Sequence, residues 1–290
     1  MKIFRIVGVP EHFNLPFRIL AKEQPFEKEG IHIDWIEESR GSGQMSQMLK
    51  SSEAEMAILL TESFFKEFDQ GNTCKLVGYH VKSPLIWGIH TRPDFPFDDL
   101  KSINHPKFLV SRMGSGSHLM ALVLAEKMNW SPKNLHFEVV GNLDGARDAF
   151  QQGSNGLFLW EKYTTSPEVK NGNMNRLDEI PSPWPCFVMV TSEKALDEFP
   201  EIARRVRDQI YSIIQKLRTQ ANLAEIISEA YKLAPDDVKQ WLLQTTWCEN
   251  NQISRSELEK IFGDLMHFGI ISHKPDISDF ALVDWLEILD

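Results

Sequence analysis

Glycine and serine residues between positions 111 and 118 form the stretch of this sequence best suited to chemistry. The segment reads SRMGSGSH; it follows a short apolar run at 108–110, and a helical pattern covers 119–128. Glycine lets the backbone approach a ligand closely, and serine supplies hydroxyls and helix N-caps. Because the first turn of a helix has unpaired N–H groups and a partial positive charge, this arrangement suits an anionic group. An ordinary turn with a serine cap is the alternative interpretation.

Polar residues also follow two other predicted strands directly. His12 comes soon after the strand 2–9, and Thr61 and Glu62 come after the strand 56–60. Ligands in open α/β sheets lie outside the carboxyl ends of the strands, so we expect these positions and the glycine–serine segment to converge. The Glu62 carboxylate could accept a hydrogen bond from an amine or a pyrimidine N–H. An acidic residue in a first helical turn is, however, also favoured by the helix dipole alone.

The elements that must position these residues alternate between strands and helices. The predicted strands are 2–9, 31–36, 56–60, 76–81, 85–90, 108–110, 135–140, 156–159 and 187–190. The predicted helices between them are 15–23, 42–50, 62–68, 119–128, 143–151 and 161–164. After residue 199 the pattern becomes helical, at 202–217, 223–231, 236–245 and 254–268. Alternating strands and helices predict an α/β fold with parallel strands, followed by a helical tail.

Composition limits the class of protein. The 290 residues, with 42% hydrophobic and 25% charged side chains, are ordinary for a globular protein of one large or two medium domains. A net charge of −10 argues against nonspecific binding of nucleic acid or anionic membranes. Three widely spaced cysteines provide neither a zinc ribbon nor a disulfide framework. The first apolar run is too short for a signal peptide or a membrane span, so we expect a cytoplasmic protein, or a periplasmic or surface-anchored one if a signal was removed.

Catalysis receives no positive support from the sequence. No serine–histidine–aspartate order, pair of carboxylates or cluster of metal ligands stands out, so we expect no cofactor and no metal. Residues 236–268 could form a helix-turn-helix, but the second helix is more acidic than basic, whereas a recognition helix should be basic. We therefore expect no nucleic-acid partner. We interpret the tail as helices packed on the first lobe, the lobe that contains the N-terminal strands.

Several strings of residues resemble a known family. The strings GVP at 8–10, PF at 16–17, EGI at 29–31 and GSG at 41–43 resemble type II periplasmic solute-binding proteins of ABC importers, in the branch that binds alkanesulfonates, nitrate and thiamine precursors. A narrower resemblance, to proteins of this fold without secretion signals, is carried by TE at 61–62, SPLIW at 83–87, SRMGSGS at 111–117, LWEKYTT at 159–165 and PWP at 183–185.

The resemblance implies a two-lobed type II periplasmic-binding-protein-like fold with a C-terminal helical extension. Lobe 1 would be residues 1–88 completed by the tail 191–290, and lobe 2 would be residues 89–190. Hinge motion near 87–91 and 186–190 would close the lobes on a ligand. A second helix start at 41–44 would then oppose the glycine–serine segment and help to clamp an oxyanion.

The resemblance further implies a binding protein for a compact anionic or zwitterionic molecule, without membrane insertion. The expected ligand is a sulfonate, phosphate, carboxylate or pyrimidine-like molecule, and an ABC-transporter permease is a further expected partner. A cytosolic enzyme on the same fold, acting on a related metabolite, is the alternative. The candidate ligand-binding residues are His12, Asn14, Ser42, Gly43, Thr61, Glu62, Ser83, Arg112, Gly114, Ser115, Gly116, Ser117, Trp160 and Glu161.

Trp160 and Arg112 also have purely structural alternatives. Trp160 follows a strand and could stack on a ring or pack on an alkyl chain, or it could be a core residue. Arg112 could pair with an acid group of the ligand, or it could form a salt bridge with Glu161.

Overall fold

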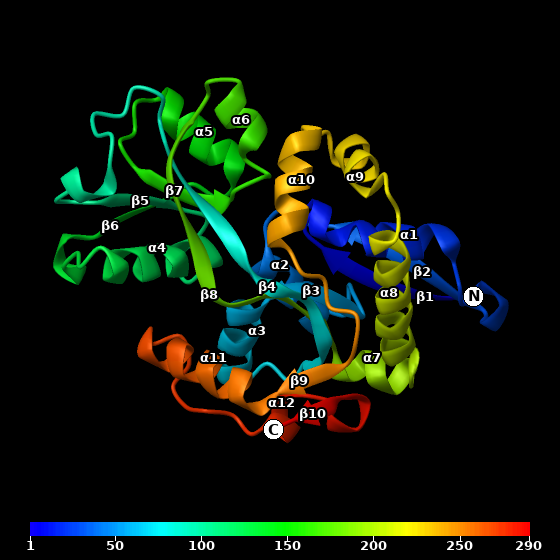
Figure 1. Ribbon diagram of the computed structural model, residues 1–290. Helices are drawn as coiled ribbons and strands as arrows, with labels where there is room; N and C mark the ends of the chain where they lie inside the picture. The colour runs from blue at the N-terminus through cyan, green and yellow to red at the C-terminus, as the bar shows by residue number, and fades with distance from the viewer. The chain divides into compact units, whose positions relative to one another are not determined.

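The computed structural model describes residues 1–290, which form two compact units (Figure 1). Unit 1 comprises residues 1–83, 183–231 and 244–290, and unit 2 comprises residues 84–182 and 232–243. Strands β4 (Lys75–Thr91) and β8 (Asn175–Thr191) belong to both, because a unit boundary falls within each strand. The lobe boundaries expected from the sequence, after residues 88 and 190, lie within the same two strands.

Unit 1 is built on three parallel strands, β1 (Lys2–Gly8), β2 (Ile31–Glu37) and β3 (Met56–Leu60). Strand β1 lies between β2 and β3, and β3 pairs antiparallel with the end of β8. The short apolar runs of β1 and β3 are typical of strands that are covered on both faces of a sheet. Their side chains are accordingly buried from Met56 to Leu59.

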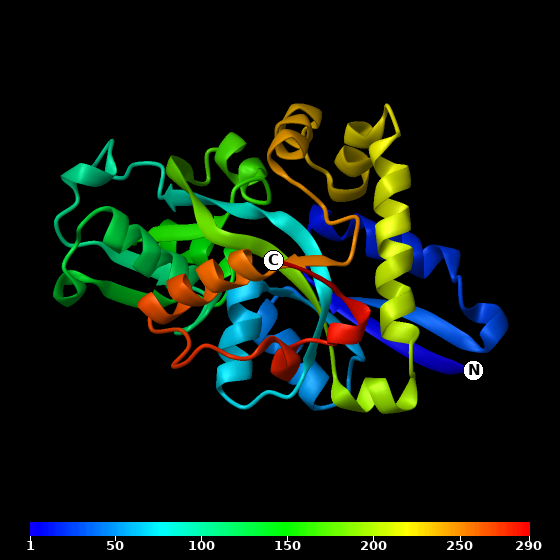
Figure 2. The same ribbon diagram turned by 60° about the horizontal axis from the view of Figure 1, so that its bottom comes forward.

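Helices cover this sheet and form the tail. Figures 1 and 2 both show the long helix α8 beside α1, and the apolar residues of α8 recur at helical spacing on its buried face. None of the helices combines the length and apolar character needed to cross a membrane. The helices of unit 1 are α1 (Leu15–Glu23), α2 (Ser42–Lys50), α3 (Thr61–Asp69), α7 (Glu193–Glu198), α8 (Ile202–Arg218), α9 (Leu223–Tyr231), α11 (Arg255–His267) and α12 (Ile277–Phe280). Its 3-10 helices are η1 (His12–Asn14), η2 (Glu27–Glu29) and η5 (Val283–Trp285).

The tail adds a second, two-stranded sheet to unit 1. Strand β9 (Gln252–Ser254) pairs in parallel with β10 (Glu287–Leu289). Ser254 caps helix α11, since its Oγ accepts a hydrogen bond from the backbone N–H of Glu257 at 3.3 Å. This side-chain cap therefore marks the start of the helix.

Unit 2 contains three further parallel strands, β5 (Lys107–Val110), β6 (His136–Val139) and β7 (Leu157–Glu161). Strand β5 lies between β6 and β7, and β7 pairs antiparallel with β4. Figure 1 shows α4 below these strands and α5 and α6 above them. The helices are α4 (Gly116–Lys127), α5 (Leu143–Gln151) and α6 (Ser166–Lys170), with 3-10 helices η3 (Leu100–Ser102) and η4 (Pro132–Asn134). The helix expected at 161–164 is wrong: β7 extends to Glu161, and α6 begins only at Ser166.

Helix α10 (Pro235–Gln244) departs from the expectation that the whole tail packs on the first lobe. Residues 232–243 belong to unit 2. The carboxylate of Asp237 accepts hydrogen bonds from Ser166 Oγ at 2.5 Å and from Lys170 Nζ at 2.7 Å. These charged and polar contacts join α10 to α6.

Two strands are longer than the sequence predicted. The strands predicted at 76–81 and 85–90 are joined through Pro84 into β4, and the strand predicted at 187–190 begins at Asn175 as part of β8. Proline fits an extended strand because its fixed φ lies in the extended region. It weakens a sheet only where the neighbouring strand needs its missing N–H.

Candidate functional site

In unit 2 the carboxyl ends of three parallel strands meet at one edge of the sheet. Strand β5 pairs with β6 on one side and with β7 on the other, in both cases parallel. The ends of these strands therefore lie side by side. We call the carboxyl edge of unit 2 the segments 111–117 and 140–142, which follow β5 and β6, together with 160–161, the last two residues of β7.

The serine hydroxyls of this edge are bonded to one another and to the backbone. Ser115 caps α4, because its Oγ accepts from the backbone N–H of His118 at 3.3 Å. Ser117 Oγ accepts from the backbone N–H of Ser111 at 2.9 Å. The Oγ atoms of Ser111 and Ser115 lie 3.3 Å and 3.1 Å from that of Ser117. Three hydroxyl protons share two hydroxyl–hydroxyl contacts, so at least one proton remains to donate to a ligand.

The backbone at the start of α4 offers further donors. The first-turn N–H groups of Gly116 and Ser117 make no hydrogen bond within unit 2, since the Ser115 side chain satisfies only that of His118. Gly114, at φ +74°, adopts the left-handed conformation that glycine tolerates best. Arg112, in the same turn and partly exposed, adds a full positive charge. These features favour an anion.

A second helix starts at the same edge, and our sequence analysis did not include it in the site. Asn142 caps α5, with its Oδ1 accepting from the backbone N–H of Gly145 at 3.1 Å. Gly141 has φ +82°, and a Cβ at Gly145 would lie 1.8 Å from the carbonyl oxygen of Val140. The pair Gly-Asn after a predicted strand was the available sequence signal.

Trp160 and Glu161 are held largely by unit 2 itself. The indole of Trp160 stacks on Phe158, with ring centroids 5.2 Å apart, and it packs against the apolar core between β7 and α5. Trp160 therefore has the core role, and part of its ring remains exposed. The carboxylate of Glu161 accepts from the backbone N–H groups of Tyr163 and Thr164 at 3.0 Å and 2.6 Å. Burial raises the pKa of Glu161 to about 7.

Unit 1 has a carboxyl edge of its own. Strands β2, β1 and β3 are parallel neighbours, so the segments after them lie together. We call residues 9–14, 38–43 and 61–62 the carboxyl edge of unit 1.

The start of α2 at this edge has no side-chain cap. Gly41 precedes the helix with φ +80°, and the first-turn N–H groups of Ser42 and Gly43 are not bonded to a capping side chain. The Oγ of Ser42 accepts from the backbone N–H of Leu60 at 3.0 Å. That bond ties α2 to the end of β3, and it leaves the hydroxyl proton of Ser42 as a donor.

Thr61 and Glu62 begin α3 and are both buried. Thr61 Oγ1 donates to the carbonyl oxygen of Cys186 at 3.4 Å. The indole Nε1 of Trp184 donates to Glu62 Oε2 at 2.7 Å. Burial raises the pKa of Glu62 to about 7, so both its protonation states are populated near neutral pH.

His12 and Asn14 lie in η1, directly after the first strand. His12 packs against Phe13 and Tyr231, and burial lowers its pKa to about 3, which keeps it neutral. Asn14 Nδ2 donates to the carbonyl oxygen of Val9 at 2.8 Å. Its Oδ1 is buried and accepts no hydrogen bond, and it is therefore an unused acceptor.

Ser83 lies outside both edges. It belongs to the middle of β4, and its Oγ accepts from the backbone N–H of Thr246 at 3.0 Å. The structure thus gives Ser83 a role in holding the segment before β9.

The residues brought together are suited to hydrogen bonding rather than to covalent chemistry. The three cysteines are buried and form no disulfide, and no group of three or more histidine, cysteine, aspartate or glutamate side chains could hold a metal ion. The carboxyl edge of unit 2 presents backbone N–H donors. The carboxyl edge of unit 1, considered separately, presents the acceptors of Glu62 and Asn14.

Comparison with known proteins identifies the fold of this chain. Along 97% of its length the chain superposes on 96% of the Candida albicans CA3427 gene product, described as exhibiting the generic periplasmic binding protein structural fold, with a TM-score of 0.86 and 24% identity. This chain has the type II periplasmic-binding-protein fold. The sequence-based expectation of this fold is confirmed. Residues 87–180 also match the family model described as Ca3427-like PBP.

Other proteins of the type II periplasmic-binding-protein fold are similar at lower identity. The alkanesulfonate-binding protein SsuA from Xanthomonas axonopodis pv. citri, bound to MOPS, matches with a TM-score of 0.75 and 13% identity over 100% of this chain and 99% of that one. The nitrate-binding protein NrtA from Synechocystis PCC 6803 matches with a TM-score of 0.73 and 12% identity over 98% and 87%. No curated protein matches the sequence significantly.

Proposed function

We propose that this protein binds a compact oxyanion-bearing solute, and that the carboxyl edge of unit 2 binds the oxyanion. The observation that carries the proposal is the pair of helix starts, α4 and α5, that follow the neighbouring strands β5 and β6. Each helix N-terminus carries roughly half a positive charge, and an anion there needs no counter-charged side chain. The free N–H groups of Gly116 and Ser117 supply directed hydrogen bonds.

The similar proteins support the same ligand class. SsuA is described as binding alkanesulfonates and NrtA as binding nitrate, and both ligands present several equivalent oxygens around a small centre. Phosphate and carboxylate share this geometry. We therefore propose a sulfonate, nitrate, phosphate or carboxylate as the bound group.

Gly116→Pro tests the proposal directly. Gly116 is the first residue of α4, where proline is tolerated, and the preceding Ser115 is already extended at φ −80° and ψ 170°. The substitution removes one N–H donor while the helix remains. Gly116→Ala keeps the donor and is the matched control.

Isothermal titration calorimetry with methanesulfonate, nitrate and phosphate measures the effect. A hydrogen bond to a charged group contributes about 1.5–3 kcal/mol, so we expect Gly116→Pro to raise the Kd of the bound anion by about 10- to 100-fold. Gly116→Ala should bind nearly as the parent does. If none of the three anions binds, or if both variants bind alike, the proposal fails.

We further propose that the carboxyl edge of unit 1, taken by itself, binds an ammonium group. Glu62 and the unbonded Oδ1 of Asn14 could accept hydrogen bonds from it. Calorimetric titration with ethylammonium tests this, and Glu62→Gln should weaken the binding because it removes the negative charge. If ethylammonium does not bind, or binds equally to the parent and Glu62→Gln, this proposal fails.

We also propose that the protein works in the cytoplasm and passes its solute to a partner without modifying it. Fractionation of the native host tests the location. Incubation with the bound solute, followed by mass spectrometry, tests for turnover, and a new product would favour an enzyme.

A further inference from the structure

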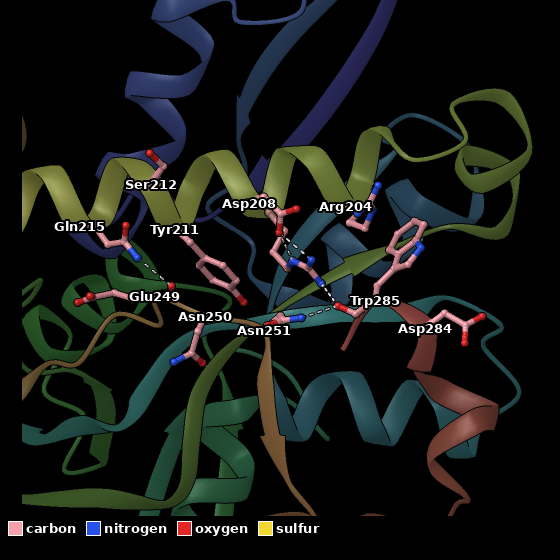
Figure 3. Close-up of a pocket in the computed structure, with 11 residues that line it drawn as sticks. Arg204, Asp208, Tyr211, Ser212, Gln215, Glu249, Asn250, Asn251, Asp284 and Trp285 are labelled. Carbon is pink, nitrogen blue, oxygen red and sulfur yellow. Dashed lines mark hydrogen bonds and ion pairs between the residues drawn. The ribbon is translucent and has the colours of Figure 1, made fainter. Parts of the chain in front are cut away.

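Unit 1 contains a polar cavity that shares no residue with its carboxyl edge. The cavity has a volume of about 470 Å³ and lies between one face of α8 and two segments of the tail, 249–251 and 284–285 (Figure 3). We call it the α8 pocket. Its volume is within the range of small-molecule sites, about 300–1,000 Å³, but its lining is mostly polar, unlike that of most ligand pockets.

The cationic groups of the α8 pocket are already neutralised. Arg207 is only 3% exposed, and its guanidinium donates to the carbonyl oxygens of Val77 and Trp285 at 3.1 Å and 2.6 Å. It also donates twice to Asp208 Oδ1, at 2.9 Å and 2.7 Å. The other charged lining residues Arg204 and Glu249 pair with Glu201 and Arg218. The pocket therefore has no surplus positive charge for an anion.

Three amide side chains are each held at one end and free at the other. Gln215 donates from Nε2 to the carbonyl oxygen of Glu249 at 3.3 Å, and Asn251 donates from Nδ2 to that of Trp285 at 3.0 Å (Figure 3). Asn250 Oδ1 accepts from a backbone N–H two residues further along, at 3.2 Å. These bonds orient two free acceptors, on Gln215 and Asn251, and one free donor group, on Asn250.

The free groups include both acceptors and a donor, and this combination favours one chemical class of ligand. An ammonium group satisfies only acceptors, and an oxyanion satisfies only donors, whereas a hydroxyl group both donates and accepts. Ser212 and the exposed carboxylate of Asp284 add further partners on the same walls. Trp285, partly buried, adds an aromatic surface on which the C–H groups of a ring can pack.

We propose that the α8 pocket binds a small neutral polyhydroxylated molecule, a sugar or cyclitol, between the oriented amides of Gln215, Asn250 and Asn251 and the indole of Trp285. The pocket is thus a second ligand site, separate from the oxyanion site. Binding here needs no charge on the ligand. Its affinity is therefore insensitive to salt, whereas screening weakens a purely ionic contact at an exposed site.

Calorimetric titration of the full chain with D-glucose, trehalose and myo-inositol tests the proposal. We expect at least one of them to bind, with an affinity that is unchanged between 20 mM and 500 mM sodium chloride. Gln215→Met removes the oriented amide and nearly preserves its length, so it should raise the Kd about threefold to tenfold. Lys216→Met, at the next exposed position of α8 and outside the pocket, is the matched control and should leave the Kd unchanged. Trp285→Ala should weaken binding further than Trp285→Phe.

The outcomes separate this site from the oxyanion site. Gly116→Pro should leave sugar binding intact, and Gln215→Met should leave anion binding intact, so either site can fail alone. Binding of putrescine with the same loss in Gln215→Met, and no binding of the three polyols, would show a cation site and overturn the proposal. It is also overturned if no polyol binds at 50 mM, or if the polyol that binds does so equally to Gln215→Met, Trp285→Ala and the parent.

Discussion

The buried carboxyl of Glu62 makes a quantitative prediction about stability and pH. Its side chain is 3% exposed, and its one hydrogen bond to another side chain comes from Trp184. Because burial disfavours the charged form, the pKa rises from 4.5 to about 7 in the folded protein. A group with a higher pKa in the folded state binds more protons when folded. Its stabilisation is thus complete below pH 4.5 and is lost as the pH rises through about 7.

The magnitude follows from that rise. Each pKa unit corresponds to about 1.4 kcal/mol, so ionisation of Glu62 lowers the free energy of unfolding by about 3 kcal/mol above pH 7. Glu62→Gln removes the charge and keeps an acceptor for the indole of Trp184. Relative to the parent, the variant should gain under about 1 kcal/mol at pH 5 and about 3 kcal/mol at pH 8.

Urea denaturation followed by circular dichroism at pH 5, 6, 7 and 8 measures the difference. Other titrating groups, Glu161 included, are common to both proteins and cancel. Trp184→Phe is the complementary variant, because the indole hydrogen bond lowers the pKa of Glu62. Loss of this hydrogen bond should raise the pKa of Glu62 further, so the free energy of unfolding should continue to fall at higher pH than in the parent. Parallel pH profiles of the free energy of unfolding for the parent and Glu62→Gln would refute the reasoning. They would mean that ionising Glu62 in the folded protein costs no free energy.

Two further predictions concern local structure. Gly145→Ala should destabilise the protein strongly, because its Cβ would meet the carbonyl oxygen of Val140 at 1.8 Å; Gly263→Ala on α11, with nothing within 4 Å, should stabilise by about 0.5–1 kcal/mol. Calorimetric melting temperatures check this pair, and shifts in the same direction would contradict it. Asp237→Asn should loosen α10 by removing its ion pair with Lys170, raising amide exchange in 235–244 about fivefold. Unchanged exchange, measured by mass spectrometry, would mean that apolar packing alone holds the helix.

Elements with local signals were predictable from the sequence. The helices expected at 202–217 and 254–268 are observed at Ile202–Arg218 and Arg255–His267. Apolar spacing and capping residues lie within the segment they describe, so tertiary contacts change such boundaries little. The helix start after the glycine–serine turn was predictable for the same reason, because Ser115 caps α4 through a backbone N–H only three residues away.

Strand continuity was not predictable in the same way. Pro84 suggested a break, yet β4 continues through it. A proline ends a strand only if a neighbouring strand needs its N–H, and that neighbour is set by the tertiary fold. For the same reason the tail's helices were expected but the place of α10 was not, since Asp237 meets partners on α6, some seventy residues earlier.

The sequence by itself determined which residues can do chemistry here: glycines and serines at helix starts, and polar side chains after strands. The tertiary structure alone decided which of those groups are already used. The hydroxyl oxygens of Ser42 and Ser83 accept from the backbone N–H groups of Leu60 and Thr246, so both oxygens serve the fold. The N–H groups of Gly116 and Ser117 remain available. Hydrogen bonding is saturable and its partners here are distant in the chain, so only the folded arrangement distinguishes a structural donor from one that can bind a ligand.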